Sequence, residues 1–139
     1  MKNEMLVLVS VSVSAVLTLG GGVSFAHHST SATYINGQTV KIEGTLKELI
    51  WRNPHSFIRV EAPDDKGAMQ SWIIEGAAPG QLAEQGLTSN TLRPGNHVIV
   101  KGRPGRIAED HRLLLETLER PSDGFKWQGP AAAPQLGLR

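Results

Sequence analysis

The feature that most constrains the fold is a strict alternation of apolar and polar side chains that begins at Val40. Apolar residues recur on one face as far as Ile50, and polar residues occupy the other face. A period of two places successive side chains on opposite sides of a strand, so residues 40–50 are predicted to form a half-buried β-strand. Gly44 falls on the apolar face within this strand, where a glycine often marks a bulge or a tight bend such as the corner of a barrel.

Four further segments have the composition of short strands and are separated by turn residues. They cover residues 56–61, 69–75, 97–101 and 113–118. Continuous leucines in the last segment indicate burial on both faces. Residues 79–86 carry proline near the start and glycine at the end, which is the asymmetry of a short helix. Five strands with one helix between strands 3 and 4 predict an all-β fold, a small five-stranded OB-like (oligonucleotide/oligosaccharide-binding) barrel. An open sandwich of the same strands is the alternative.

The start of the chain has the pattern of a secretory signal. Lys2 precedes an apolar run, and the small residues Ser24 and Ala26 occupy positions −3 and −1 of a signal-peptidase site. The run contains serines and is shorter than the roughly 20 residues that a membrane-spanning helix needs. We therefore expect cleavage after Ala26, a mature protein that begins at His27, and export to the periplasm without a membrane span.

Composition limits the rest of the chain. Of its 139 residues none is cysteine, which excludes disulfides, thiolate metal sites and cysteine nucleophiles. The net charge is +1, and the basic residues form no stripe along the sequence. Both features argue against nucleic acid as a partner. We expect a signal peptide over 1–26, a barrel domain over 27–120, and a flexible tail rich in proline, glycine and alanine over 121–139. Phe125 and Trp127 could pack the first part of this tail onto the barrel.

Cleavage after Ala26 would make His27 and His28 the first two residues of the mature chain. A free N-terminal histidine offers its amine and its ring Nδ1 to one metal ion, and a second imidazole, from His28 or His55, would complete an all-nitrogen site. Tetragonal nitrogen sites favour Cu(II), and binding would weaken as the pH falls because the ligands must lose their protons. The alternative is that the histidine pair is incidental. The remaining histidines, His97 and His111, are expected to be solvated.

A second candidate site is the turn that runs from Trp51 through Asn53 to His55. Asn-Pro sets a sharp turn, and a histidine beside a tryptophan could be a metal ligand or a polar recognition group. The structural alternative is a corner in which His55 is hydrogen-bonded to the backbone and Trp51 covers the core. Together with Trp72 and Glu75 from the third predicted strand, these residues form our set of candidate ligand-binding residues.

Catalytic signatures are absent from the sequence. It has no Gly-x-Ser-x-Gly, no His-Glu-x-x-His and no phosphate-binding loop. Asp110 precedes His111 directly, but no serine that could act as a nucleophile accompanies this pair. We therefore expect no enzyme, but an exported periplasmic binding or accessory module for a small ligand or a protein partner. Copper binding through His27 is the alternative function, and copper is the one cofactor that the sequence suggests.

The chain resembles the exported bacterial family known as domain of unknown function 6152. Four stretches carry the resemblance: residues 27–29, Trp51-Arg52-Asn53-Pro54-His55, Trp72-Ile73-Ile74-Glu75-Gly76 with Pro79 and Leu82, and Leu92-Arg93-Pro94-Gly95 before residues 97–100. The resemblance implies a small periplasmic β-barrel of a Gram-negative bacterium and brings no established activity. The chain departs from the family at Asn96, where aspartate is commoner, and at Ser56-Phe57, where Ala-Trp is commoner. The second departure changes the aromatic residue beside His55.

Overall fold

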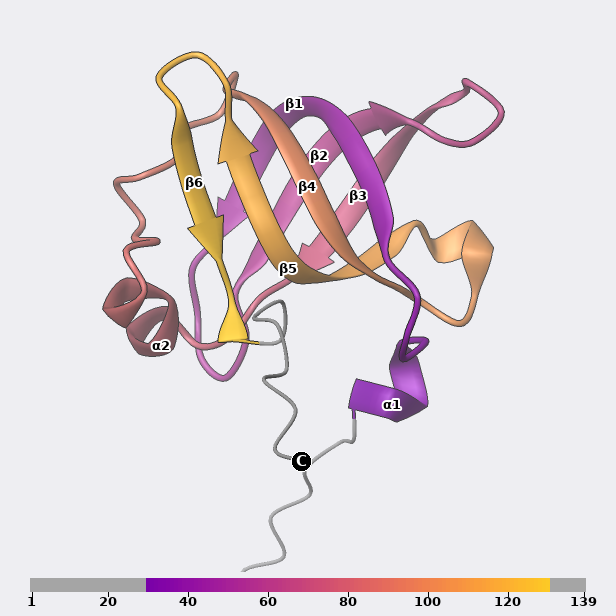
Figure 1. Cartoon of the computed structure of the whole chain (residues 1–139), viewed down its shortest axis with the longest axis horizontal. Coiled ribbons are helices and arrows are strands. Elements are labelled where there is room, and N and C mark those ends of the chain that lie inside the picture. The colour runs from indigo at the N-terminus through magenta and orange to yellow at the C-terminus, as the bar shows by residue number, and fades with distance from the viewer. Residues whose placement is uncertain (1–29, 131–139) are drawn as a thin grey trace, which may run out of the picture.

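The computed structural model describes residues 30–130, and its strands curve into a small barrel (Figure 1). The strands are β1 (Val40–Ile50), β2 (Phe57–Pro63), β3 (Met69–Glu75), β4 (His97–Pro104), β5 (Arg112–Arg120) and β6 (Phe125–Gln128). The helices are α1 (Thr30–Thr33), α2 (Pro79–Glu84) and a 3₁₀ turn, η1 (Ala108–Asp110). The third strand has the predicted bounds, and α2 lies between strands 3 and 4 as predicted.

The strand order confirms the OB-like barrel and excludes the open sandwich. Neighbouring strands follow the order β3-β2-β1-β4-β5-β6, and a further parallel pairing of β3 with β5 closes the sheet on itself. In that pairing Ile74 lies opposite Leu113, and both side chains are buried. Closure removes most of the free strand edges that such short strands would otherwise expose.

The first strand bends so that it belongs to both halves of the barrel. Its beginning pairs with β4 and its end pairs with β2, and Thr45 has partners in both strands. A Cβ atom at Gly44 would lie 2.0 Å from the carbonyl oxygen of Glu61, so no larger residue fits at this crossing. A register shift between Leu46 and Glu48 follows directly. The predicted bend at Gly44 is confirmed, because only glycine allows β2 to approach this closely.

The core lies inside the barrel and follows the alternation of the strands. In β5, Leu113 and Leu115 point inward and are buried, whereas Leu114 is only partly buried on the outer face. The expected burial of the leucine run on both faces is therefore wrong. The outer face of this strand is only partly covered, so residues 113–115 obey the period of two despite being continuous leucines. A register shift then follows, and Leu118, three residues after Leu115, is the next buried side chain.

The two ends of the described chain contain more structure than the sequence indicated. Residues 125–128, within the expected flexible tail, form β6, which pairs with β5. Trp127 is 5% exposed and joins the core, as the sequence suggested for the first part of the tail. At the other end, residues 30–33 form one helical turn. Within residues 30–130, no helix has the length and apolar composition that crossing a bilayer requires.

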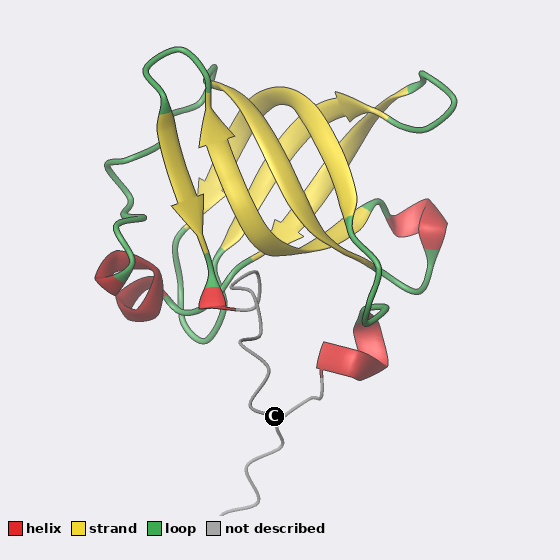
Figure 2. Ribbon diagram, in the orientation of Figure 1, coloured by secondary structure: helices red, strands yellow, loops and turns green. Residues whose placement is uncertain are grey.

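The loops gather at two ends of the barrel. The β2–β3 loop, the β4–β5 loop with its short η1 turn, and α1 lie at one end, and α2 lies at the other (Figures 1 and 2). Helix α2 places Leu82 against the core and covers that end. The first end has the two loops, the short η1 turn and the single turn of α1, and no helix packs into the core there.

Candidate functional site

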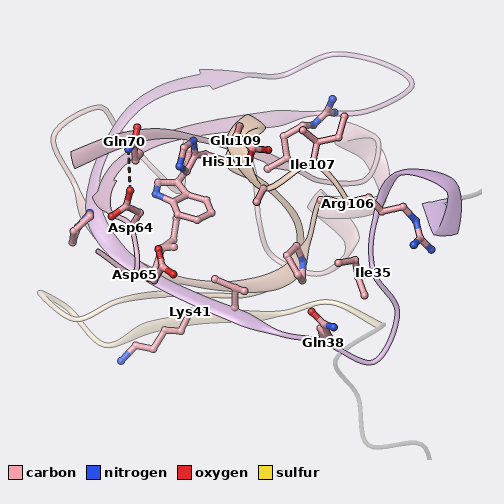
Figure 3. Close-up of a pocket in the computed structure, with 18 of the residues that line it drawn as sticks. Ile35, Gln38, Lys41, Asp64, Asp65, Gln70, Arg106, Ile107, Glu109 and His111 are labelled. Atoms are coloured by element: carbon pink, nitrogen blue, oxygen red, sulfur yellow. Dashed lines mark hydrogen bonds between the residues drawn. The ribbon is translucent and has the colours of Figure 1, made fainter. Parts of the chain in front are cut away.

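A groove of about 700 Å³ opens at the loop-covered end of the barrel (Figure 3). Its walls are the β2–β3 loop, the β4–β5 loop and the segment that leads into β1. Val40 and Ile42, from the inward face of β1, contribute apolar surface to it. Pockets for small molecules commonly measure about 300–1,000 Å³ and are mostly apolar with a few placed polar groups. The groove has the size of such a pocket, and its lining is more polar.

Trp72 and His111 meet in this groove. The two rings are 5.1 Å apart between centroids and nearly perpendicular. Trp72 lies opposite Val60 in the β2–β3 ladder, so its side chain turns toward the barrel interior, and its indole N–H donates to the Ala62 carbonyl oxygen at 3.2 Å. The hydrogen bond fixes the indole in the groove wall. A fixed aromatic ring of this kind is a stacking surface for an apolar face of a ligand.

The backbone of His111 has an unusual conformation. Its φ of 47° lies in the left-handed region, and His111 is the one residue other than glycine with a positive φ among residues 30–130. Its N–H donates to the Ala108 carbonyl at 3.2 Å, and its own carbonyl accepts a hydrogen bond from the Ile73 N–H at 2.9 Å. Such strained residues persist where the surroundings hold them in place, and they cluster at functional sites. We expected His111 to be solvated, but the structure places its ring against Trp72.

Charges of both signs surround the groove. Asp64 accepts hydrogen bonds from the Gln70 amide and from the backbone N–H groups of Lys66 and Ala68, each at 2.9 Å. These bonds, Gln70 first, lower the pKa of the Asp64 carboxyl below its ordinary value, and Figure 3 shows Asp64 beside Gln70. Asp65, Lys66 and Lys41 are exposed at the rim, as is Glu109. Asp64 thus stabilises the β2–β3 loop, while the exposed charged side chains at the rim are available to contact a ligand.

A second polar cluster lies on the outer face of the barrel, around Glu75. One carboxylate oxygen, Oε2, accepts a 2.5 Å hydrogen bond from the Tyr34 hydroxyl and lies 3.2 Å from Nη2 of Arg112. The other, Oε1, lies 3.3 Å from Nδ1 of His55. The Glu75 side chain is only 14% exposed. Both oxygens of this carboxylate therefore have partners within the chain.

This cluster fastens the segment before β1 to the barrel. Tyr34 is 1% exposed and forms an isolated bridge with Gly105, and Ile35 donates to the Pro104 carbonyl at 2.9 Å. Burial, followed by the hydrogen bond to Glu75, raises the pKa of the Tyr34 hydroxyl well above its usual range. A neutral, buried phenol that donates to a carboxylate is suited to structural stabilisation. This hydrogen bond between Tyr34 and Glu75 holds one wall of the groove in place.

The structure brings together only part of the predicted ligand-binding set. His55 and Glu75 are in contact, but Trp72 turns to the interior while Glu75 is on the outer face. Trp51 is partly buried against the core, and Asn53 is exposed in a turn whose peptide bond to Pro54 is cis. His55 Nδ1 also lies 3.3 Å from the Gly76 carbonyl oxygen. This geometry matches the structural alternative for the turn.

The metal prediction falls mainly outside the described residues, where His27 and His28 lie. Within residues 30–130, no group of three His, Asp or Glu side chains is placed to hold a metal ion. His55 is described, and its side chain is 45% exposed. The copper site therefore stays a prediction.

The fold and the groove define a class of protein, a small closed barrel of OB type with a ligand-sized groove between its loops. More particularly, the chain belongs to a family of unknown function, DUF6152, whose model matches residues 15–114. No curated protein sequence matches it. Among solved structures, it is similar to the mitochondrial single-stranded DNA-binding protein Rim1 from S. cerevisiae, with 17% identity and a TM-score of 0.38 over 64% of this chain and 79% of that chain.

Proposed function

We propose that this protein is an exported, non-catalytic binding module that holds a small ligand in the groove against Trp72. The observation that carries the proposal is the groove itself, about 700 Å³ in volume, with a fixed indole in its wall and exposed charges at its rim. The β4–β5 loop, which borders ligand sites in many OB barrels, supplies His111 to this groove.

The lining favours a polar ligand without a large net charge. Acidic and basic side chains both line the groove, and the amides of Gln38 and Gln70 add donors and acceptors. An indole beside such groups suits a molecule that has hydrogen-bonding groups around an apolar face, as sugars and short peptides do. A segment of a periplasmic protein partner would present the same chemistry. The mixed charge gives no support to nucleic acid as a ligand.

The histidine–carboxylate contact on the outer face supports a structural role better than a catalytic one. Both oxygens of Glu75 are engaged by Tyr34, Arg112 and His55, and neither Glu75 nor His55 lines the groove. A general base needs a free lone pair within reach of a substrate. We therefore include this pair in the scaffold and not in a reaction centre.

The proposal is tested by screening a library of small polar molecules against the purified protein by saturation-transfer NMR. Compounds that bind should lose at least about tenfold in affinity in Trp72→Leu, because the stacking surface is removed. Phe57→Leu is the matched control, since it removes an aromatic ring from the outer face. Hits that bind equally well to Trp72→Leu would contradict the proposal.

Export is a separate part of the proposal and rests on the leader sequence. Fractionation of cells that express the full chain should place the protein in the periplasm. Its mass should correspond to a chain that begins at His27. An intact Met1 on the periplasmic protein would contradict cleavage.

Copper binding is the second candidate, and one observation favours it. His55 directs Nδ1 toward the Glu75 carboxylate and the Gly76 carbonyl, which is the arrangement that metal-binding histidines commonly show, with the other ring nitrogen left for the metal. In this alternative the amine and ring of His27 bind Cu(II) with His28 or His55. Electron paramagnetic resonance should then show a type 2 copper signal that an added N-terminal Met abolishes. Unchanged copper binding in that form or in His27→Ala would exclude the site.

A further inference from the structure

A second, smaller hollow lies on the outer face of the barrel, and Arg112 lines both this hollow and the groove. It measures about 230 Å³ and extends over parts of β1, β2 and β3 to the start of β5. Three of the residues that line it are arginines, namely Arg52, Arg59 and Arg112. Apolar side chains provide the rest of the lining, and no acidic residue of the described chain belongs to it.

The strand register explains why these side chains converge. Arg59 of β2 lies opposite Ile73 of β3, and Ile73 lies opposite Arg112 of β5. Because neighbouring strands are about 4.8 Å apart, the Cα atoms of the two arginines are separated by roughly 10 Å, with Ile73 between them. On the next row, Ile50 lies opposite Phe57. The result is an apolar floor with a cationic group on either side.

The third arginine comes from the turn after β1. The Arg52 guanidinium lies over the Phe57 ring, 5.5 Å from its centroid. This contact is with a ring and not with a carboxylate, so no acidic side chain among residues 30–130 neutralises the positive charge of Arg52. Arg52 thus contributes a cationic group that a ligand can pair with.

The other two arginines have acidic partners, but these do not saturate them. Arg59 pairs with Glu48 at 3.0 Å and Arg112 with Glu75 at 3.2 Å, in each case through one terminal nitrogen. A guanidinium group has five N–H donors, so such a pair leaves donors for a further acceptor. The hollow therefore combines an apolar floor with several N–H donors and a local excess of positive charge.

We propose that this hollow binds a small organic anion whose carboxylate, phosphate or sulfate group pairs with Arg52 and Arg59 while its apolar part lies over Ile73 and Phe57. Arginine is the side chain best suited to bidentate binding of such oxyanions. The hollow is smaller than the pockets of drug-sized ligands, so it fits a compact molecule. The site lies on a different face from Trp72, and Arg52 and Arg59, which would hold the anion, do not line the groove.

The test uses phenyl phosphate as the probe, titrated into the purified protein by isothermal calorimetry at low salt. We expect Arg52→Gln and Arg59→Gln each to weaken binding about tenfold, because each removes a charge-assisted hydrogen bond. Arg93→Gln is the matched control: it removes the same charge from an exposed position in the turn before β4, and binding should stay unchanged. Trp72→Leu should also leave it unchanged, which separates this site from the groove.

Two further probes identify what the hollow recognises. Benzyl alcohol, which has the ring without the charge, should not bind, and inorganic phosphate should bind more weakly than phenyl phosphate. Vesicles containing phosphatidylglycerol distinguish a lipid headgroup from a free anion. Equal binding of phenyl phosphate to Arg52→Gln, Arg59→Gln and Arg93→Gln would overturn the proposal. Absence of binding to the unaltered protein, or binding of the vesicles alone, would overturn it equally.

Discussion

Glu75 and Trp72 belong to the same strand, but they face opposite sides of the barrel wall and serve different purposes. The Glu75 carboxylate is nearly buried, and Tyr34, Arg112 and His55 occupy both of its oxygens. Trp72 instead lies in a groove whose rim carries exposed acids and bases. Polar groups that are satisfied within the chain stabilise the fold, whereas exposed ones around a fixed aromatic ring are available to a ligand.

The groove around Trp72 also depends on the cluster around Glu75. The hydrogen bond from Tyr34 to Glu75 holds the segment before β1, and Ile35 and Gln38 of that segment line the groove. The outer cluster is thus the support, and the groove is the surface that it shapes. Changes in the first should reduce stability, and changes in the second should reduce binding.

The largest effect on stability is expected for Glu75→Gln. The substitution keeps the size of the side chain but removes the charge that pairs with Arg112, so the free energy of unfolding should fall by about 2 kcal/mol. Chemical denaturation measures this change. Glu61→Gln, which breaks a half-exposed pair with Lys47 at 2.9 Å, is the control and should cost about 0.5 kcal/mol. Equal losses in both variants would remove the distinction between the cluster and the ordinary surface.

Tyr34→Phe should cost about 1.5 kcal/mol at neutral pH, because a hydrogen bond to a carboxylate is lost. The raised pKa of Tyr34 also predicts a pH dependence. Below about pH 10 the hydroxyl is neutral in both states, and the full stability is present. Above that pH the unfolded chain loses the proton while the folded chain keeps it, so stability falls as the pH rises, by up to about 1.4 kcal/mol per pH unit.

The chain has a single tyrosine, so its phenolate absorbance reports Tyr34 alone. We expect no phenolate in the native protein until it unfolds at high pH. The unfolded chain in denaturant should titrate near pH 10. A native protein that titrates near pH 10 would show that the Tyr34 hydroxyl is neither buried nor held by Glu75.

Many local features of the fold could be predicted from the sequence. The alternation around Gly44 predicted the first strand and its bend, and Pro79 predicted the start of α2. These features depend on neighbours in the chain, where period and turn chemistry are informative. The last strand, β6, could not be predicted in this way, because a short segment becomes a strand only when β5 is there to pair with it.

The same reason explains why the candidate site was only partly predicted. His55 and Glu75 were both candidates, but their contact with Tyr34 and Arg112 depends on the parallel pairing of β3 with β5, which closes the barrel. That pairing also brings His111 to Trp72. Sequence patterns carry no information on such non-local contacts. His111 stands in a charged loop before a run of leucines, and this pattern predicted a solvent-exposed side chain instead of one that lines a groove.

Within the groove, Trp72→Leu should remove at least about 1.4 kcal/mol of binding free energy for a groove ligand, which is the tenfold loss stated above. Glu75→Gln should leave the affinity within about twofold as long as the variant is folded. Calorimetry on both variants with the same ligand makes the comparison. The reverse result, a loss of binding only in Glu75→Gln, would place the ligand site on the outer face.

The smallest effect on stability is expected for His111→Asn. Asparagine tolerates the left-handed backbone, so the free energy of unfolding should change by less than about 0.5 kcal/mol. Affinity for the groove ligand should still fall, because the ring that meets Trp72 is gone. His111→Val is the contrasting variant, since a β-branched residue is strained at this φ and should destabilise the fold.

The most direct test of the division between scaffold and groove is a chemical-shift map of the ¹⁵N-labelled protein with a bound ligand. We expect the largest changes on the Trp72 indole N–H and on the amides of the β2–β3 and β4–β5 loops, with His55 and Glu75 unchanged. Changes centred on His55 and Glu75, with none at Trp72, would contradict this division.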